Sequence, residues 1–249
     1  MVDTHCHLDA CAGPLDELVE RARTAGVRRM ATVGTDPESV ERALAAARAH
    51  EEVSAIVGRH PHAAEGFSEA DLEDIERAAC EPGVCAIGET GLDYYRDLAP
   101  RADQRRAFEA QLELARRLGL PVAIHTRAAE EDTFAILREH AGETTVILHC
   151  FSAPDRLEEC VERGYMCSFA GNVTYPKAAE LQAAAREVPA ELLLVETDAP
   201  YLAPQPVRGK ANEPANVALT AGFVAENRAT TYSELERLVE ENAARVLRW

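Results

Sequence analysis

The sequence predicts an α/β protein of the (β/α)8, or TIM, barrel class, formed by a single domain over residues 1–249 with an extra C-terminal helix. Three observations predict this fold. Short apolar runs alternate eight times with longer stretches of mixed charge, most of these runs are apolar throughout, and histidines and carboxylates gather where the runs end. An open doubly wound sheet is the alternative, but such a sheet normally has a glycine-rich phosphate-binding turn after its first strand, and this chain has none there.

The strands are expected in eight short segments. They cover residues 2–6, 29–34, 53–58, 84–88, 121–125, 145–149, 166–170 and 192–197. The runs MATVG, SAIVG, CAIG, VAIH, VILH and LLLVE are nearly continuous and rich in Val and Ile, which is typical of strands buried on both faces of a parallel sheet. The first strand differs, because its period of two places Asp3, His5 and His7 on one face. This strand therefore predicts a site for a cation.

Helices are expected between the strands. They cover residues 14–25, 37–50, 71–80, 103–118, 130–141, 155–163, 177–187 and 214–227, and a ninth covers 233–247. Several begin at residues that favour helix starts, namely Asp36 before Pro37, Pro154 with Asp155, and Ser233 with Glu236 three positions on. Eight strands that alternate with eight helices favour a closed barrel.

Composition narrows the class of protein further. No apolar run approaches the roughly 20 residues that span a bilayer, and no signal peptide is apparent, so we expect a cytoplasmic monomer without membrane contact. The seven cysteines include no C-x-x-C pair, which argues against a disulfide framework or a cysteine zinc site. The net charge of -17 disfavours binding along an extended duplex, because such binding needs many Lys and Arg contacts to phosphate.

Polar residues at the strand ends indicate the position of the active site. In a parallel barrel the carboxyl ends of all strands form one rim, which carries the active site. The residues expected there are His5, His7, His60, His62, Glu89, His125, His149 and Asp198. The other two histidines, His50 and His140, lie at the ends of expected helices, where an imidazole beside the last carbonyls has a structural explanation.

Four of these imidazoles and the two carboxylates suit two divalent metal ions. Zinc or manganese fits the mixture of nitrogen and oxygen, whereas magnesium prefers more oxygen and water. Glu89 is expected to bridge the two ions. The other ligands are His5, His7 and Asp198 for one ion, and His125 and His149 for the second. Asp198 is also expected to take the proton from a water molecule that the metal acidifies.

Seven motifs occur in a fixed order along the chain. They are THCHLD (4–9), GRHPH (58–62), IGETGLDYYRD (87–97), QRRAFEAQLELARRLGLPVAIHTR (104–127), LHCFS (148–152), GNVTYPKA (171–178) and LVETDAPYLAP (194–204), with RGKANEP (208–214) after the last. Together they resemble the TatD family of metal-dependent deoxyribonucleases over nearly the whole chain. The resemblance implies an amidohydrolase-like barrel with a divalent-metal centre that hydrolyses phosphodiester bonds in DNA, often from a 3′ end.

The resemblance also carries over residue by residue. The six residues that match the family's metal ligands are the six chosen above, His5, His7, Glu89, His125, His149 and Asp198. His60 and His62 match its H-P-H segment beside the metals, where phosphate contact or proton transfer is expected. The chain departs from the family pattern at Arg59, usually apolar, at Ala128, where an acidic residue is common, and at Ala211, where a basic residue is frequent.

Substrate contacts are expected from residues around the same rim. Arg127 lies two positions beyond His125 and is expected either to bind a phosphate oxygen or to pair with Glu130 or Glu131. Tyr201 is one of several tyrosines after strand ends that would stack on an unpaired base. Arg208 and Lys210 lie in the loop after the eighth strand and are expected either to contact the nucleic-acid backbone or to remain solvated. Asp93 is expected to hold a loop or to orient a ligand histidine.

Three classes of function remain open at this point. The first is a nuclease that acts on short single-stranded ends of DNA. The second is a hydrolase of carboxylic esters, lactones or amides with the same metals, including D-aminoacyl-tRNA deacylation, because fold and metals do not determine the substrate. The third is a metal-binding protein without catalysis, which would need neither Asp198 nor an open metal position.

Overall fold

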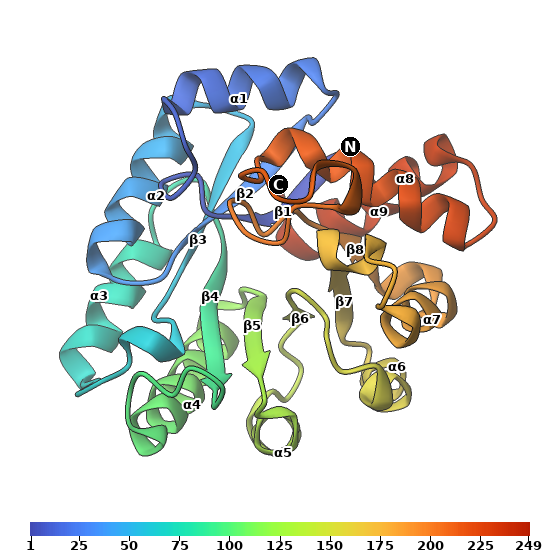
Figure 1. The fold of residues 1–249 in the computed structure, drawn as a ribbon. Coiled ribbons are helices and arrows are strands. Elements are labelled where there is room, and N and C mark those ends of the chain that lie inside the picture. Colours follow the sequence, from blue (N-terminus) through green and yellow to red (C-terminus); the bar gives the residue numbers. More distant parts are fainter.

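Eight parallel strands form a barrel, and helices surround them (Figure 1). The computed structural model describes residues 1–249. The strands are β1 (Val2–Cys6), β2 (Arg29–Gly34), β3 (Val53–Val57), β4 (Val84–Asp93), β5 (Val122–Arg127), β6 (Val146–Leu148), β7 (Met166–Phe169) and β8 (Leu193–Val195). They pair in sequence order from β1 to β8, each parallel to the next. This order confirms the predicted barrel and excludes the doubly wound sheet, in which the strand order reverses.

Nine helices occupy the predicted segments. They are α1 (Leu15–Thr24), α2 (Pro37–Ala49), α3 (Glu69–Ala79), α4 (Arg101–Leu118), α5 (Glu130–His140), α6 (Leu157–Arg163), α7 (Ala179–Glu187), α8 (Val217–Asn227) and α9 (Tyr232–Leu247). The last of them, α9, is the extra helix, and it packs on β1 and β8 where the first and last strands meet.

Two predicted helix starts are wrong. Pro154 and Asp155 belong to a 3-10 turn, and α6 begins only at Leu157. Helix α9 is capped by Thr231 with Glu234, not by Ser233 with Glu236, since the Thr231 side chain accepts from the Glu234 backbone N–H and Glu234 accepts from Thr231 in return. The prediction for α2 is confirmed, because Asp36 accepts hydrogen bonds from Glu38 and Ser39.

Several strand ends also differ from prediction, and the differences matter for the site. Strand β4 continues to Asp93 instead of ending at residue 88. Strands β6 and β8 end early, at Leu148 and Val195, so that His149 and Asp198 lie in the loops beyond them. Single hydrogen bonds still tie both residues to neighbouring strands, since the His149 N–H donates to the Ile124 carbonyl at 3.2 Å and the Asp198 N–H to the His5 carbonyl at 2.9 Å.

The seam between β1 and β8 closes without a regular ladder. The Thr4 hydroxyl donates to the Val195 carbonyl at 3.0 Å, the Asp198 N–H donates to the His5 carbonyl at 2.9 Å, and the His7 N–H donates to the Ala199 carbonyl at 2.7 Å. The hydrogen bonds that close the barrel therefore also fix the backbone of three residues predicted to bind metal.

The protein has a continuous apolar core and no disulfide bonds, as its composition predicts. Strand residues such as Ile56, Ile87 and Phe169 are fully buried in one continuous apolar core. All seven cysteines are free thiols, so no disulfide contributes to the fold. None of the helices combines the length and the apolar character that crossing a bilayer requires.

Candidate metal centre

Glu89, in the middle of β4, is the centre of the candidate site. Its Oε2 atom lies 3.4 Å from His5 Nε2 and 3.7 Å from His7 Nε2. Its Oε1 atom lies 2.7 Å from His125 Nδ1 and 3.0 Å from His149 Nε2. The two oxygens of one carboxylate thus face two different pairs of histidines, which is the arrangement expected of a bridging ligand.

Asp198 lies beside the two β1-side histidines of the centre, His5 and His7. Its Oδ1 atom lies 3.5 Å from His7 Nε2. Asp198 has a φ of 53°, in the left-handed region, and its backbone N–H is held by the His5 carbonyl. The structure therefore brings together all six predicted ligands, with His5, His7 and Asp198 on the Oε2 side of Glu89 and His125 and His149 on the Oε1 side.

The approach of β4 to β5 depends on a glycine. Gly91 has a φ of 139°, and a Cβ at this position would lie 2.0 Å from the His125 carbonyl oxygen. Only glycine permits both this backbone conformation and this close contact. Gly91 therefore allows Glu89 and His125 to meet across the two strands.

The donor set fits divalent metal ions. His5 Nε2 is buried and has no hydrogen-bond partner, a position that a cation would satisfy. Donor atoms that share one tetrahedral ion with bonds of about 2.1 Å lie roughly 3.4 Å apart. The separations among His5, His7, Glu89 and Asp198, from 3.4 to 3.7 Å, match that spacing.

The side formed by β5 and β6 is spaced differently. His125 and His149 lie at hydrogen-bond distance from Glu89 Oε1, close enough to share protons with it. Burial lowers the pKa of His149, but the charges of Glu89 and Glu196 outweigh it and raise that pKa well above its usual value. Burial likewise raises the pKa of Glu89, but the charges of His149 and His60 hold it well below its usual value. An ion on this side would replace these protons.

His60 and His62 lie beside this second pair. His60 Nε2 is 3.5 Å from Glu89 Oε1, and burial lowers the pKa of His60 to about 4. Its Nδ1 atom accepts a hydrogen bond from the His62 backbone N–H at 3.0 Å. His60, Glu89 and His125 form one of the groups whose donor atoms all lie within 4.8 Å of one another. The neutral imidazole of His60 is therefore itself in reach of a metal ion.

Asp93 performs both roles that the sequence left open. Its Oδ2 atom accepts from His62 Nε2 at 2.7 Å and lies 3.2 Å from His125 Nε2. Its Oδ1 atom accepts from the backbone N–H groups of Tyr95 and Arg96, which shapes the loop after β4. Burial raises the pKa of Asp93, but these hydrogen bonds outweigh it and keep the pKa below its usual value.

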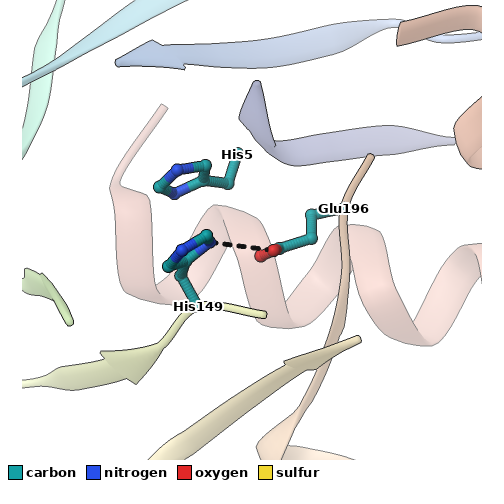
Figure 2. Close-up of side chains that lie close together, drawn as sticks. All are labelled: His5, His149 and Glu196. Carbon is teal, nitrogen blue, oxygen red and sulfur yellow. Dashed lines mark hydrogen bonds and ion pairs between the residues drawn. The ribbon is translucent and has the colours of Figure 1, made fainter. Parts of the chain in front are cut away.

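Sequence reasoning missed the buried polar residues that support the centre. Glu196 is fully buried, and its Oε1 atom accepts from His149 Nδ1 at 3.0 Å (Figure 2). Asp3 does not face the centre, because its carboxylate accepts from the backbone N–H and the hydroxyl of Thr197 at 2.9 and 2.6 Å. Burial raises the pKa of Asp3 to about 8. The sequence did carry a signal for Glu196, because a carboxylate is unusual in an apolar run and this one lies two residues before Asp198.

Two buried glutamines of α4 hold the neighbouring segments. Gln111 accepts from the Arg59 N–H at 2.7 Å and donates to the Thr90 hydroxyl at 2.7 Å. Gln104 accepts from the Asp93 N–H at 2.9 Å. One helix therefore fixes the backbone next to His60 and at the end of β4.

Of the predicted substrate-contact residues, Arg127 is the exposed last residue of β5, and the others are exposed and lie in the segment after β8. The guanidinium of Arg127 lies 4.1 Å above the Tyr95 ring and pairs with neither Glu130 nor Glu131. The guanidinium of Arg208 lies 4.2 Å above the Tyr175 ring, and Lys210 is exposed. Tyr201, 57% exposed, has its ring centroid 5.9 Å from that of His7.

Comparison with known proteins adds to this geometry. A family model described as TatD related DNase matches residues 2–248. A Bacillus subtilis (strain 168) protein, described as the uncharacterized metal-dependent hydrolase YabD, is 38% identical over 100% of this chain and 99% of its own length. The 3'-5' ssDNA/RNA exonuclease TatD of Edwardsiella piscicida is 36% identical over 95% of this chain and 94% of its own. The crystal structure of YJJV, a TATD homolog from Escherichia coli K12, superposes with a TM-score of 0.93 at 30% identity and covers 100% of this chain and 98% of that chain.

Proposed function

The chain belongs to the TatD related DNase family of metal-dependent hydrolases, and we propose that it removes nucleotides from single-stranded nucleic-acid ends by hydrolysing phosphodiester bonds, from the 3′ end. The observation that carries the proposal is the position of Glu89, whose two oxygens face separate sets of histidines. Relatives described as 3'-5' ssDNA/RNA exonucleases support the substrate and the polarity.

In this proposal the centre holds two divalent ions, zinc, manganese or magnesium. Glu89 would hold both ions, with His5, His7 and Asp198 as the further ligands of one and His125 and His149 of the other. Ions bound there would supply Lewis acidity to the attacking water and to the scissile phosphate. The remaining chemistry belongs to side chains of this protein.

Asp198 acts as the general base. Burial raises the pKa of Asp198, but the hydrogen bond and charge of His7 outweigh it and keep that pKa below its usual value, so the group is ionised at neutral pH. Its carboxylate is therefore able to accept the proton of the attacking water. His60 and His62, on the opposite side of Glu89 from His7, contact the phosphate or return a proton to the leaving oxygen.

Cations around the mouth support an anionic substrate. Arginines elsewhere on the surface mostly pair with carboxylates. Five exposed cations at the end of β5 and in the loops after β4, β7 and β8 form no such pair, namely Arg96, Arg127, Lys177, Arg208 and Lys210. We call these five residues the cationic rim. In a protein of net charge -17, cations left unpaired at one end favour local binding of phosphates.

The surface also favours an unpaired strand end over a long duplex. Tyr201 beside His7 and Tyr95 beneath Arg127 each present an exposed ring to the mouth. Bases can stack on such rings only when they are not paired. The acidic remainder of the surface would repel a duplex that extends beyond the rim.

The direct test uses protein stripped with a chelator. It is incubated with 5′-labelled single-stranded DNA or RNA, with and without added manganese, magnesium or zinc, beside Asp198→Asn and the exposed control Asp155→Asn. We expect metal-restored shortening by the parent and the control, and a rate lower by about 10²–10⁴-fold in Asp198→Asn. A parent that is inert with every ion yet hydrolyses lactones or aminoacyl esters would overturn the nuclease proposal.

A further inference from the structure

We propose that Glu196 is a positioning residue of the metal centre, which holds the His149 imidazole with Nε2 toward Glu89 and thereby sets the affinity for divalent ions. The inference rests on the metal centre of the proposed function but not on its nucleic-acid substrate. Nothing in the motif pattern that identified the six ligands assigns a role to Glu196.

One oxygen of Glu196 fixes both the ring and the backbone at His149. Its Oε1 atom accepts from His149 Nδ1 at 3.0 Å and from the Cys150 backbone N–H at 2.8 Å. Cys150 has a φ of 44°, a left-handed conformation that is costly for a residue with a side chain. The chain therefore needs an outside contact to hold this bend, and Glu196 supplies it.

The orientation of the ring follows from this contact. With Nδ1 occupied by Glu196, only Nε2 of His149 is free to face the centre, where it lies 3.0 Å from Glu89 Oε1. Figure 2 shows the His5 ring over one face of the His149 ring and the Glu196 carboxylate at its edge. The His5 and His149 ring centroids are 3.8 Å apart at an interplanar angle of 17°, so neither ring can turn without the other moving.

Glu196 has no competing partner. The side chain is fully buried, it forms no pair with Lys or Arg, and its Oε2 atom has no hydrogen-bond partner. His149 and Cys150 are therefore the only donors that this carboxylate serves. A buried carboxylate without a cation partner is costly to keep, which argues that its contact with His149 has a use.

The carboxylate is itself held firmly. The Glu196 backbone N–H donates to the Phe169 carbonyl in β7 at 3.1 Å. The next residue, Thr197, is fixed to Asp3 of β1 by two hydrogen bonds. The position of Glu196 is thus set by the strands on both sides, and the position of the His149 ring follows from it.

The size of the effect can be anticipated. A carboxylate that accepts from the far nitrogen of a ligand histidine fixes its tautomer and direction, and its loss typically lowers metal affinity by 10- to 100-fold. The same change need not unfold the chain, because glutamine has the size of glutamate and its carbonyl can still accept one hydrogen bond.

The experiment measures zinc binding by calorimetry on chelator-stripped protein. The variants are Glu196→Gln, Glu196→Asp, His149→Ala and the exposed control Glu187→Gln, which removes the same charge from the surface. We expect one zinc ion to bind about 10- to 100-fold more weakly in Glu196→Gln and Glu196→Asp, that ion to be lost in His149→Ala, and no change in Glu187→Gln. Glu196→Asp keeps the negative charge but moves the carboxylate away from His149 by one methylene. This variant therefore distinguishes an effect of the carboxylate's position from an effect of its charge.

A second readout is independent of affinity. In the zinc-loaded parent, the His149 Nδ1 proton should give a downfield-shifted resonance in the NMR spectrum, and this resonance should move or vanish in both Glu196 variants. Wild-type affinity and an unchanged resonance in Glu196→Asp would overturn the positioning role, and this variant decides the matter if Glu196→Gln does not fold. If His149→Ala binds zinc as the parent does, His149 is not a metal ligand. That result would refute the metal centre itself, whereas the Glu196 variants test only the positioning role of Glu196.

Discussion

The buried metal centre and the exposed cationic rim use polar side chains in opposite ways. In the centre each group is fixed by several contacts, as Glu89 shows with five imidazoles around its two oxygens. On the rim each cation lies in solvent, and Arg127 and Arg208 touch only the face of a tyrosine. The comparison teaches that chemistry depends on single residues that cannot be replaced, whereas substrate affinity is shared among several residues of small individual effect.

The largest effect is expected from Glu89→Gln. The amide would remove the only carboxylate that faces both histidine pairs and would take away the charge of Glu89 that raises the pKa of His149. We expect elemental analysis to show the loss of most bound metal. We also expect kcat/KM to fall by more than about 10²-fold, a larger loss than for a residue that only hydrogen-bonds to a metal ligand. Near-normal metal content in this variant would mean that the centre is not organised around Glu89.

Tyr201 tests the border between the two regions, because its exposed ring lies against His7. We expect Tyr201→Ala to raise KM for single-stranded DNA about tenfold, which corresponds to roughly 1.4 kcal/mol of base stacking. Tyr201→Phe keeps the ring and should retain the parent KM. Steady-state kinetics with both variants separates stacking from hydrogen bonding by the hydroxyl, and equal losses in the two would refute a stacking role.

A smaller effect is expected when two cations of the rim are removed. The double variant Arg208→Ala and Lys210→Ala should weaken DNA binding only several-fold at low salt. The slope of log K against log salt should fall by about 1.4, since each lost phosphate contact on a single strand contributes about 0.7. Binding measured by fluorescence anisotropy over a salt series gives the slope.

The matched control removes two unpaired cations from elsewhere. Arg29 lies at the start of β2, and Arg237 lies on α9, whose Glu236 pairs with the amino group of Met1 at the opposite end of the barrel from the mouth. Arg29→Ala with Arg237→Ala should leave the salt slope unchanged. An equal loss in this control would show that net charge, and not the rim, governs binding.

The smallest effect is expected at Glu234, which lies in neither region. Hydrogen bonds from the Thr231 backbone and the Thr231 and Thr230 hydroxyls lower the pKa of Glu234 to about 2. A carboxyl pKa that is lower in the folded state stabilises the protein above the unfolded pKa near 4.5, and this stabilisation disappears as the pH falls through about 2. Glu234→Gln should therefore melt slightly below the parent at pH 7, with a gap that closes in acid, and should keep full activity at pH 7. Calorimetry at several pH values measures the gap, and a gap that widens in acid would contradict the assignment.

Much of the fold and the location of the metal centre could be predicted because barrel strands leave strong signals. Apolar runs give the strands, and residues such as His125 at their carboxyl ends must converge on one rim. The chain could not show where each run leaves the sheet. Strand β4 continues to Asp93 because Gly91 lets its backbone meet β5, a contact between segments that no local pattern encodes.

The supporting residues were missed for a related reason. Glu196 and Gln111 have no periodic signal, and each acts on a group far away in sequence, at His149 and Arg59 respectively. Asp3 has the right period to join His5 but turns to Thr197, in the loop after β8, instead. Spacing along a strand predicts which face a side chain takes, but the partner on that face is set by the neighbouring strand.

The irregular seam between β1 and β8 has a consequence for how the protein matures. During translation His5 and His7 leave the ribosome first, whereas Asp198 and the carbonyls of Val195 and Ala199 that complete the seam are made near the end. A nascent chain can therefore fold much of its sheet while the catalytic pocket is still open on one side. The candidate metal centre can therefore be completed only when the last strand is in place, because Asp198 and the seam carbonyls arrive with it.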